Sequence, residues 1–64
     1  MNVEKLFELI KAYKGNTEIA VEVFFKNGAK ERLDALDLGS DTIKTNDGKI
    51  FPIDMVSHAE IFAQ

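Results

Sequence analysis

The chain has 64 residues, of which 45% are hydrophobic, and its 8 basic and 11 acidic side chains give a net charge of −3. A chain of this length forms one domain, residues 1–64, and buries only about 60% of its unfolded surface, so its core is small. The lack of cysteine excludes disulfides and thiolate metal sites, and the spread of acidic residues argues against a general binder of phosphate backbones. No apolar run is long enough to cross a membrane, so we expect a cytoplasmic protein with no membrane contact.

An amphipathic helix is predicted over residues 3–14. Apolar residues recur there at the spacing of one helical face, and charged residues cover the remainder. Asn2 is a suitable N-cap, and Gly15 suits the left-handed position that ends many helices. A helix of about three turns is barely stable alone, so we expect its apolar stripe to pack on the rest of the chain. The stripe contains Val3, Leu6, Phe7, Leu9, Ile10 and Tyr13.

A long β-hairpin is predicted over residues 17–38. Every second residue from Thr17 to Phe25 is β-branched or aromatic, which is typical of a half-buried strand. Asn27-Gly28 supplies residues that tolerate the left-handed backbone of a hairpin turn.

The facing apolar positions favour a three-residue loop, Lys26-Asn27-Gly28, over a two-residue loop. This register places Val21 opposite Leu33 and Ile19 opposite Ala35, and it predicts a cross-strand ion pair between Glu22 and Arg32 on the solvent face. The alternation then reverses, because Leu36 and Leu38 have the opposite parity, so a bulge or sharp bend is expected near Ala35 and Leu36.

A second hairpin is predicted over residues 42–53. Asn46-Asp47-Gly48 repeats the chemistry of the first turn and places Ile43 opposite Phe51. Pro52 cannot donate a ladder hydrogen bond, so this strand is expected at a sheet edge. The C-terminal segment has two interpretations: a one-turn kink followed by a fifth strand over residues 57–63, which we favour, or a second helix that begins near Pro52.

The segments Val21–Gly28 and Ile50–Ile61 resemble the first strand with its turn, and the two closing strands, of Sm-like proteins. The order of elements is similar to that of Sm-like and SH3-like barrels. The resemblance implies an α+β fold, with an N-terminal helix and a small, bent, five-stranded antiparallel sheet or barrel. The Sm pattern that binds uridine-rich RNA is not matched, because Asp37–Asp41 lacks its Asn and Phe51-Pro52-Ile53 replaces its Arg-Gly pair.

Catalytic and metal-binding constellations are not evident, so no catalytic, cofactor or metal residue is predicted. The single histidine, His58, adjoins Ser57, but neighbours on a strand point to opposite faces and are not expected to form a nucleophile–base pair. His58 with Asp54 and Glu60 provides too few convincing ligands for a metal ion. We therefore expect neither an enzyme nor a small-molecule site.

Several apolar residues remain on faces that alternation places away from the core: Phe24, Leu36, Leu38, Ile50 and Phe62. We interpret Phe24, Leu36, Leu38 and Phe62, with Glu22 beside them, as candidates for a partner-binding patch.

The patch predicts a small non-enzymatic protein-interaction module or regulator, whose partner is another protein or a second copy of the chain. One version is a regulator that a virus or mobile element encodes and that binds a host protein. The alternative is an Sm-like barrel that binds RNA or DNA, which the acidic charge disfavours.

Overall fold

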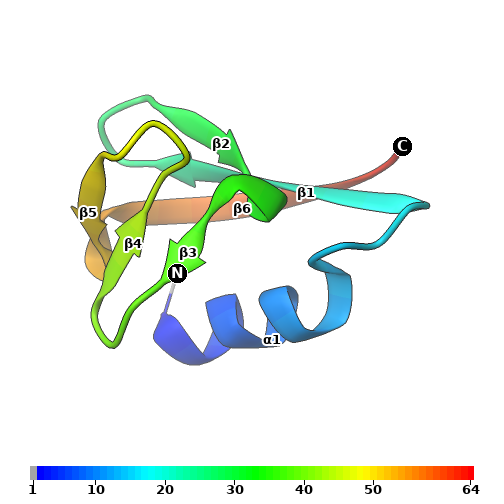
Figure 1. Ribbon diagram of the computed structural model, residues 1–64, viewed down its shortest axis with the longest axis horizontal. Helices are drawn as coiled ribbons and strands as arrows, with labels where there is room; N and C mark the ends of the chain where they lie inside the picture. The colour runs from blue at the N-terminus through cyan, green and yellow to red at the C-terminus, as the bar shows by residue number, and fades with distance from the viewer. Residues whose placement is uncertain (1) are drawn as a thin grey trace.

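The computed structural model describes residues 2–64 and contains one helix and two three-stranded antiparallel sheets (Figure 1). Sheet A has the strand order β2-β1-β6, and sheet B has the order β3-β4-β5. The α+β class with an N-terminal helix is therefore confirmed. The elements are α1 (Val3–Tyr13), β1 (Ile19–Phe25), β2 (Lys30–Arg32), β3 (Asp37–Leu38), β4 (Thr42–Lys44), β5 (Ile50–Pro52), β6 (Val56–Ala63) and two 3₁₀ turns, η1 (Leu33–Ala35) and η2 (Ile53–Met55).

The helix has the predicted ends. The Asn2 side chain accepts a hydrogen bond from the Lys5 N–H at 2.8 Å, and Gly15 has a positive φ of 81°. Leu6 and Leu9 are buried in the core, as expected for the apolar stripe, whereas Phe7 is 48% exposed. The predicted position of Val3 in the stripe is not assessed, because its side chain lies outside what the structure describes.

The first hairpin has the predicted three-residue turn. The Phe25 N–H donates to Ala29 O, the Gly28 N–H donates to Phe25 O, and Gly28 has a φ of 91°. Glu22 lies opposite Arg32, as predicted. Strand β2 ends there, however, so the predicted pairs of Val21 with Leu33 and of Ile19 with Ala35 were wrong.

A 3₁₀ turn replaces the continuous second strand. Leu33 begins this turn and Leu36 follows it, and both are 2% exposed, because residues three apart lie on the same side of a 3₁₀ turn. The chain then resumes as β3 in the other sheet. The predicted bend therefore exists but comes two residues earlier, and the expected five strands become six, divided between two sheets.

The second hairpin has the predicted register. Ile43 is fully buried and lies opposite Phe51, and Gly48 has a φ of 90°. Pro52 lies on β5, an edge strand of sheet B.

The C-terminal segment is a strand, and the alternative of a second helix was wrong. Strand β6 pairs with β1 over its full length, with Val21 opposite Ile61 and Phe24 opposite His58. The register shifts between Phe24 and Phe25, so Ser57 is an extra residue in a β-bulge. Before it, η2 places Ile53 and Val56 in the core, with the same three-residue spacing as the two leucines around η1.

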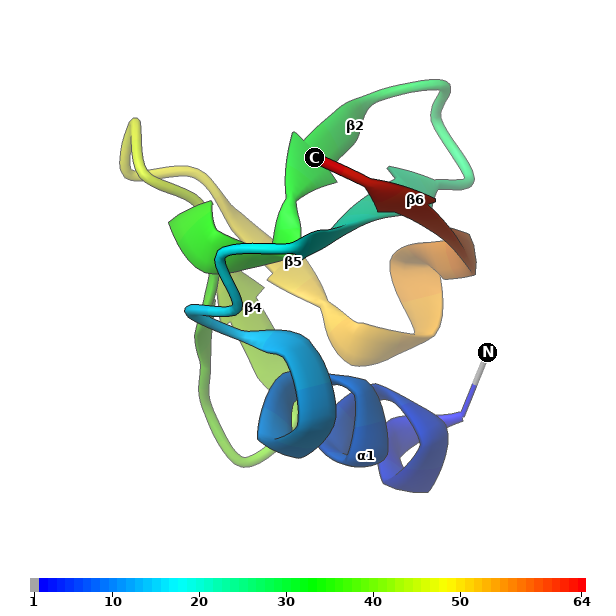
Figure 2. The same ribbon diagram turned by 90° about the vertical axis from the view of Figure 1, so that its right-hand side faces the viewer.

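The core lies between the helix and the two sheets. Figures 1 and 2 show α1 on one side of the molecule, beneath β1 and β6, with sheet B closing one end. The two sheets remain separate and do not form a closed barrel. One face of sheet A is therefore covered by the helix and the core. The buried cluster consists of Leu6, Leu9, Val21, Val23, Phe25, Leu33, Leu36, Ile43, Ile53 and Val56.

Candidate functional site

The other face of sheet A points away from the core and is called the outer face. Because side chains alternate along a strand, the residues between the buried positions of β1 all project to this face. Antiparallel pairing brings residues of β2 and β6 beside them. The outer face is made of Glu22 and Phe24 from β1, Lys30 and Arg32 from β2, and His58, Glu60 and Phe62 from β6.

Phe24 and His58 form an aromatic pair in the middle of this face. Their ring centroids are 4.6 Å apart, and the ring planes differ by only 4°. The two residues are directly opposite each other on β1 and β6, where cross-strand side chains are in contact. Phe24 is half-buried, and the His58 side chain is 55% exposed, so the stack presents ring surface to solvent.

Phe62 and Arg32 form a second aromatic contact. The guanidinium carbon of Arg32 lies 5.3 Å from the centroid of the Phe62 ring, which is a cation–π distance, and Phe62 is 40% exposed. Arg32 Nη2 donates to Gln64 Oε1 at 3.0 Å, while Gln64 Nε2 donates to Asn16 O at 2.7 Å. Gln64, itself held by Asn16, thus fixes the arginine over the ring.

The charges on the outer face are mixed. Lys30 Nζ lies 3.4 Å from Glu22 Oε1, and His58 Nε2 lies 3.6 Å from Glu60 Oε2. The predicted ion pair between Glu22 and Arg32 was wrong, because Lys30 takes the carboxylate while Arg32 extends to β6. Two cations, Lys30 and Arg32, and two carboxylates, Glu22 and Glu60, therefore surround the rings.

The structure brings together three of the five predicted partner-binding residues, Glu22, Phe24 and Phe62. Leu36 was a wrong prediction, because the η1 turn rotates its side chain into the core, where it is 2% exposed. Leu38 is half-buried and packs against that core. Ile50 is 64% exposed but lies on β5 of the other sheet.

Sequence reasoning did not select Lys30, Arg32, His58 and Glu60 as site residues. Part of their signal was present, since Lys30 and Arg32 lie opposite Phe24 and Glu22 in the hairpin, and His58 and Glu60 have the parity of Phe62 on β6. What the sequence lacked was a sign that β6 pairs with β1, because that pairing joins opposite ends of the chain.

Ser57 and His58 lie closer together than predicted. Ser57 Oγ is 3.2 Å from His58 Nδ1, because the bulge at Ser57 breaks the alternation that would have separated the two side chains. Both side chains are exposed. Among the described residues, no group of three or more His, Asp or Glu side chains could hold a metal ion.

An open hollow of about 330 Å³ lies next to the outer face. It is lined by Arg32, Asp34, Ala35 and Asn46. Asp34 accepts a hydrogen bond from the Gly15 N–H at 2.7 Å, and Arg32 is held by Phe62 and Gln64. The charged side chains that line the hollow, Arg32 and Asp34, thus already interact with other parts of the chain.

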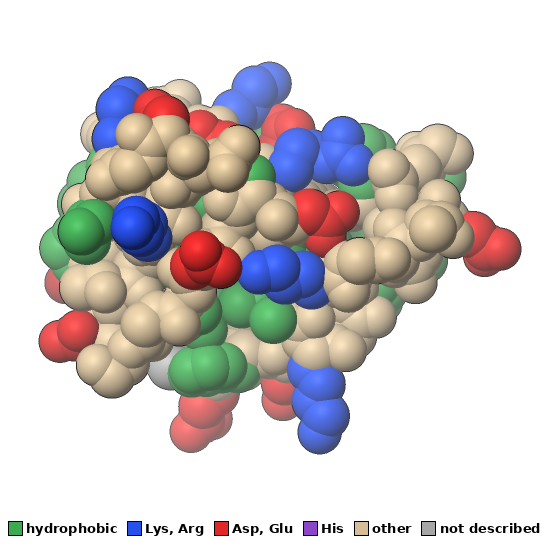
Figure 3. Space-filling model, viewed as in Figure 1, with side chains coloured by type: hydrophobic (Ala, Val, Ile, Leu, Met, Phe, Trp, Pro, Cys, Tyr) green, Lys and Arg blue, Asp and Glu red, His purple; other side chains and the backbone are tan. Residues whose placement is uncertain are grey.

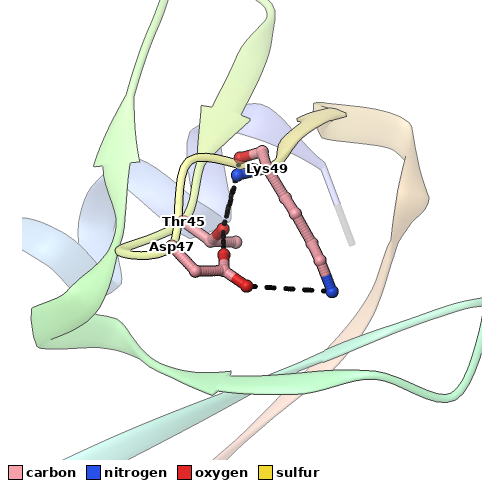
Figure 4. A network of polar contacts seen from close by, with 3 residues as sticks. All are labelled: Thr45, Asp47 and Lys49. Atoms are coloured by element: carbon pink, nitrogen blue, oxygen red, sulfur yellow. Dashed lines mark hydrogen bonds and ion pairs between the residues drawn. The ribbon is translucent and has the colours of Figure 1, made fainter.

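A second polar cluster closes the turn of sheet B (Figure 4). The buried Thr45 hydroxyl donates to Asp47 Oδ1 and accepts from the Lys49 N–H at 3.1 Å, and Asp47 Oδ2 lies 3.8 Å from Lys49 Nζ. The Thr45 hydroxyl, with smaller contributions from Lys49, holds the pKa of Asp47 below its usual 3.8. The polar groups of this cluster satisfy one another, which indicates a structural role.

The face of the molecule seen in Figure 3 shows Lys and Arg side chains interspersed with Asp and Glu, not gathered into a patch of one sign. No helix within residues 2–64 has the length and apolar composition needed to span a membrane. Comparison with protein-family models, with curated proteins and with solved structures finds no match.

Proposed function

We propose that this chain is a small non-enzymatic protein-interaction module that acts in the cytoplasm and binds a protein partner through the outer face of sheet A. The observation that carries the proposal is the exposed aromatic surface formed by the Phe24–His58 stack and by Phe62 under Arg32. Aromatic and arginine side chains are the residues most enriched among the energetic anchors of protein interfaces.

The rings of this face are already held in place by contacts within the chain. His58 stacks on Phe24, and Arg32 is fixed over Phe62 by its bond to Gln64. Binding therefore freezes few side-chain rotations, and this lowers the entropic cost of association. Lys30 and Glu22 at the border of the rings provide polar contacts for a partner of mixed charge.

A second candidate function is the binding of single-stranded nucleic acid, in line with the resemblance to Sm-like barrels. The specific observation in its favour is that Lys30 and Arg32 border exposed rings on a sheet, because bases stack on such rings while cations contact the phosphates. The carboxylates of Glu22 and Glu60 lie between those groups and repel phosphate, so we favour the protein partner.

Affinity capture from an extract of the native cell tests the first proposal. We compare the wild-type chain with Phe62→Asp, and with Ile50→Asp as the matched control, since Ile50 is also exposed and apolar but lies on sheet B. We expect Phe62→Asp to weaken capture of the partner by about tenfold or more, as for the loss of one anchor residue, and Ile50→Asp to leave it unchanged. Circular dichroism checks that both variants are folded.

The outcome that contradicts the proposal is equal capture by all three chains. Fluorescence anisotropy with labelled oligothymidylate and oligouridylate at low salt separates the two functions. Binding that falls steeply as salt rises and that Phe62→Asp weakens would establish the nucleic-acid function in place of the protein partner.

A further inference from the structure

The free edges of the two sheets differ in how they are protected against pairing with another chain. Strand β2 is short and consists of Lys30, Glu31 and Arg32, and charged residues on an edge oppose further pairing. Strand β5 contains Pro52, which cannot donate to a ladder, and β3 has two residues. Strand β6 is eight residues long and contains no Lys, Arg or Pro. Its bulge lies at Ser57, so the segment from Ala59 to Ala63 is regular and Glu60 is its one acidic residue.

The backbone N–H and C=O groups of successive β6 residues point alternately toward β1 and toward the free edge. The Gln64 N–H donates to Glu18 O at 3.0 Å, so the hydrogen-bonded pairs with β1 fall at Glu60 and Phe62. The N–H and C=O groups of Ala59, Ile61 and Ala63 must then point away from β1. This edge belongs to the end of sheet A that projects away from sheet B in Figure 1.

The side chains along this edge leave room for another strand. Ala59 and Ala63 are small, and Ile61 between them is 52% exposed although its cross-strand partner Val21 is buried. An apolar side chain that points to the core side of a sheet and remains half exposed lacks a neighbour on the edge side. A strand added to β6 supplies that neighbour.

We propose that β6 pairs antiparallel with β6 of a second copy of this chain, with a two-fold axis at Ile61. In this register Ile61 faces Ile61 of the second copy, and Ala59 faces Ala63. The Ile61 pair and the two symmetry-related pairs of Ala59 with Ala63 use the outward backbone groups and give about six hydrogen bonds. The result is one continuous sheet with the order β2-β1-β6-β6-β1-β2. This inference does not rest on the proposed function.

Charge complementarity selects this register over its neighbour. With the axis at Ile61, each Glu60 lies opposite Phe62 of the second copy, one strand spacing of about 4.8 Å away. The guanidinium of Arg32 lies over that Phe62 ring, so each Glu60 carboxylate meets an arginine of the other copy. A shift to an axis at Glu60 would place two carboxylates directly opposite each other, which is unfavourable.

Sedimentation velocity of the purified chain, from about 1 µM to about 1 mM, tests the pairing without any partner present. Because the contact is limited to one strand, we expect a reversible monomer–dimer equilibrium. Ile61→Lys places a charge on the edge and should weaken dimerisation by about tenfold or more. Ile50→Lys, on the β5 edge of sheet B, should leave it unchanged.

Charge reversal tests the register. Glu60→Arg and Arg32→Glu should each weaken the dimer, and the double variant should restore it. A chain that stays monomeric throughout, or a dimer that Ile61→Lys leaves intact and Ile50→Lys disrupts, would overturn the proposal. Closed rings larger than a dimer would do so too, because they require a head-to-tail contact. A chain that stays monomeric but still captures a protein through Phe62 would refute the dimer and leave the proposed function standing.

Discussion

The two sheets of this domain differ in how much of their surface is exposed to solvent on an organised face. Sheet B is built from strands of two or three residues, and Ile43 at its centre is fully buried. Sheet A has two longer strands, β1 of seven residues and β6 of eight, with one face in the core and an outer face of aromatic and charged residues. Both sheets contribute to the core, but only sheet A also has an outer face of exposed rings and charges. We therefore expect changes at the buried centre of sheet B to alter stability, and changes on the outer face of sheet A to leave the fold intact.

The largest effect on the free energy of unfolding is expected when the Ile43 side chain is removed. Ile43→Ala removes a fully buried side chain and leaves a cavity, so we expect it to lower the free energy of unfolding by about 2–5 kcal/mol. Ile50→Ala in the same sheet should change it by less than about 0.5 kcal/mol, because Ile50 is 64% exposed. Urea unfolding followed by circular dichroism measures both, and similar values for the two variants would contradict the assignment of the core.

A smaller effect on the free energy of unfolding is expected from substitution of the glycines in the two hairpin turns. Gly28 and Gly48 have φ values of 91° and 90°, and a Cβ atom at either site would meet no atom within 4 Å. The cost of Gly28→Ala or Gly48→Ala is therefore the backbone strain alone, about 1–2 kcal/mol, and similar for the two sheets. Asparagine tolerates this backbone better, so Gly48→Asn should cost less than Gly48→Ala by thermal unfolding. An equal loss for Asn and Ala would argue against strain as the cause.

The smallest expected effect is the change with pH of the stability that the Asp47 carboxylate contributes at the sheet B turn. Because the folded-state pKa of Asp47 is lowered, its carboxylate stabilises the fold above its unfolded value of 3.8, and this contribution is lost as the pH falls through the lower folded value. The urea midpoints of the wild type and of Asp47→Asn should therefore differ slightly near about pH 6 and converge near about pH 2. A difference that grows on acidification would contradict this sign.

The sequence predicted the features that depend on local chemistry. The helix between Asn2 and Gly15, both three-residue turns and the pairing of Ile43 with Phe51 follow from capping, left-handed residues and alternation. The position of Phe24 and Phe62 on the outer face was also predicted, because strand parity alone places them away from the core.

The features that the sequence did not predict depend on how the core packs or on pairing between distant segments of the chain. Alternation assigned Leu36 to the surface, and only the burial of Leu33 three residues earlier selects the 3₁₀ turn that brings Leu36 inward. The positions of Arg32 and His58 beside the two phenylalanines depend on where β6 pairs, which no local pattern specifies. In physical terms, the missing information is the free energy of long-range packing.

The pairing of β1 with β6 also has a consequence for synthesis on the ribosome. Gln64 bonds to Asn16 across 48 positions of the chain, so sheet A cannot be completed until residues 56–64 have left the exit tunnel. Before that, β1 can pair only with β2, and the other edge of this mostly apolar strand is open. Such an edge is prone to pair with other nascent chains. The open edge of β1 therefore favours aggregation until β6 has left the tunnel and paired with it.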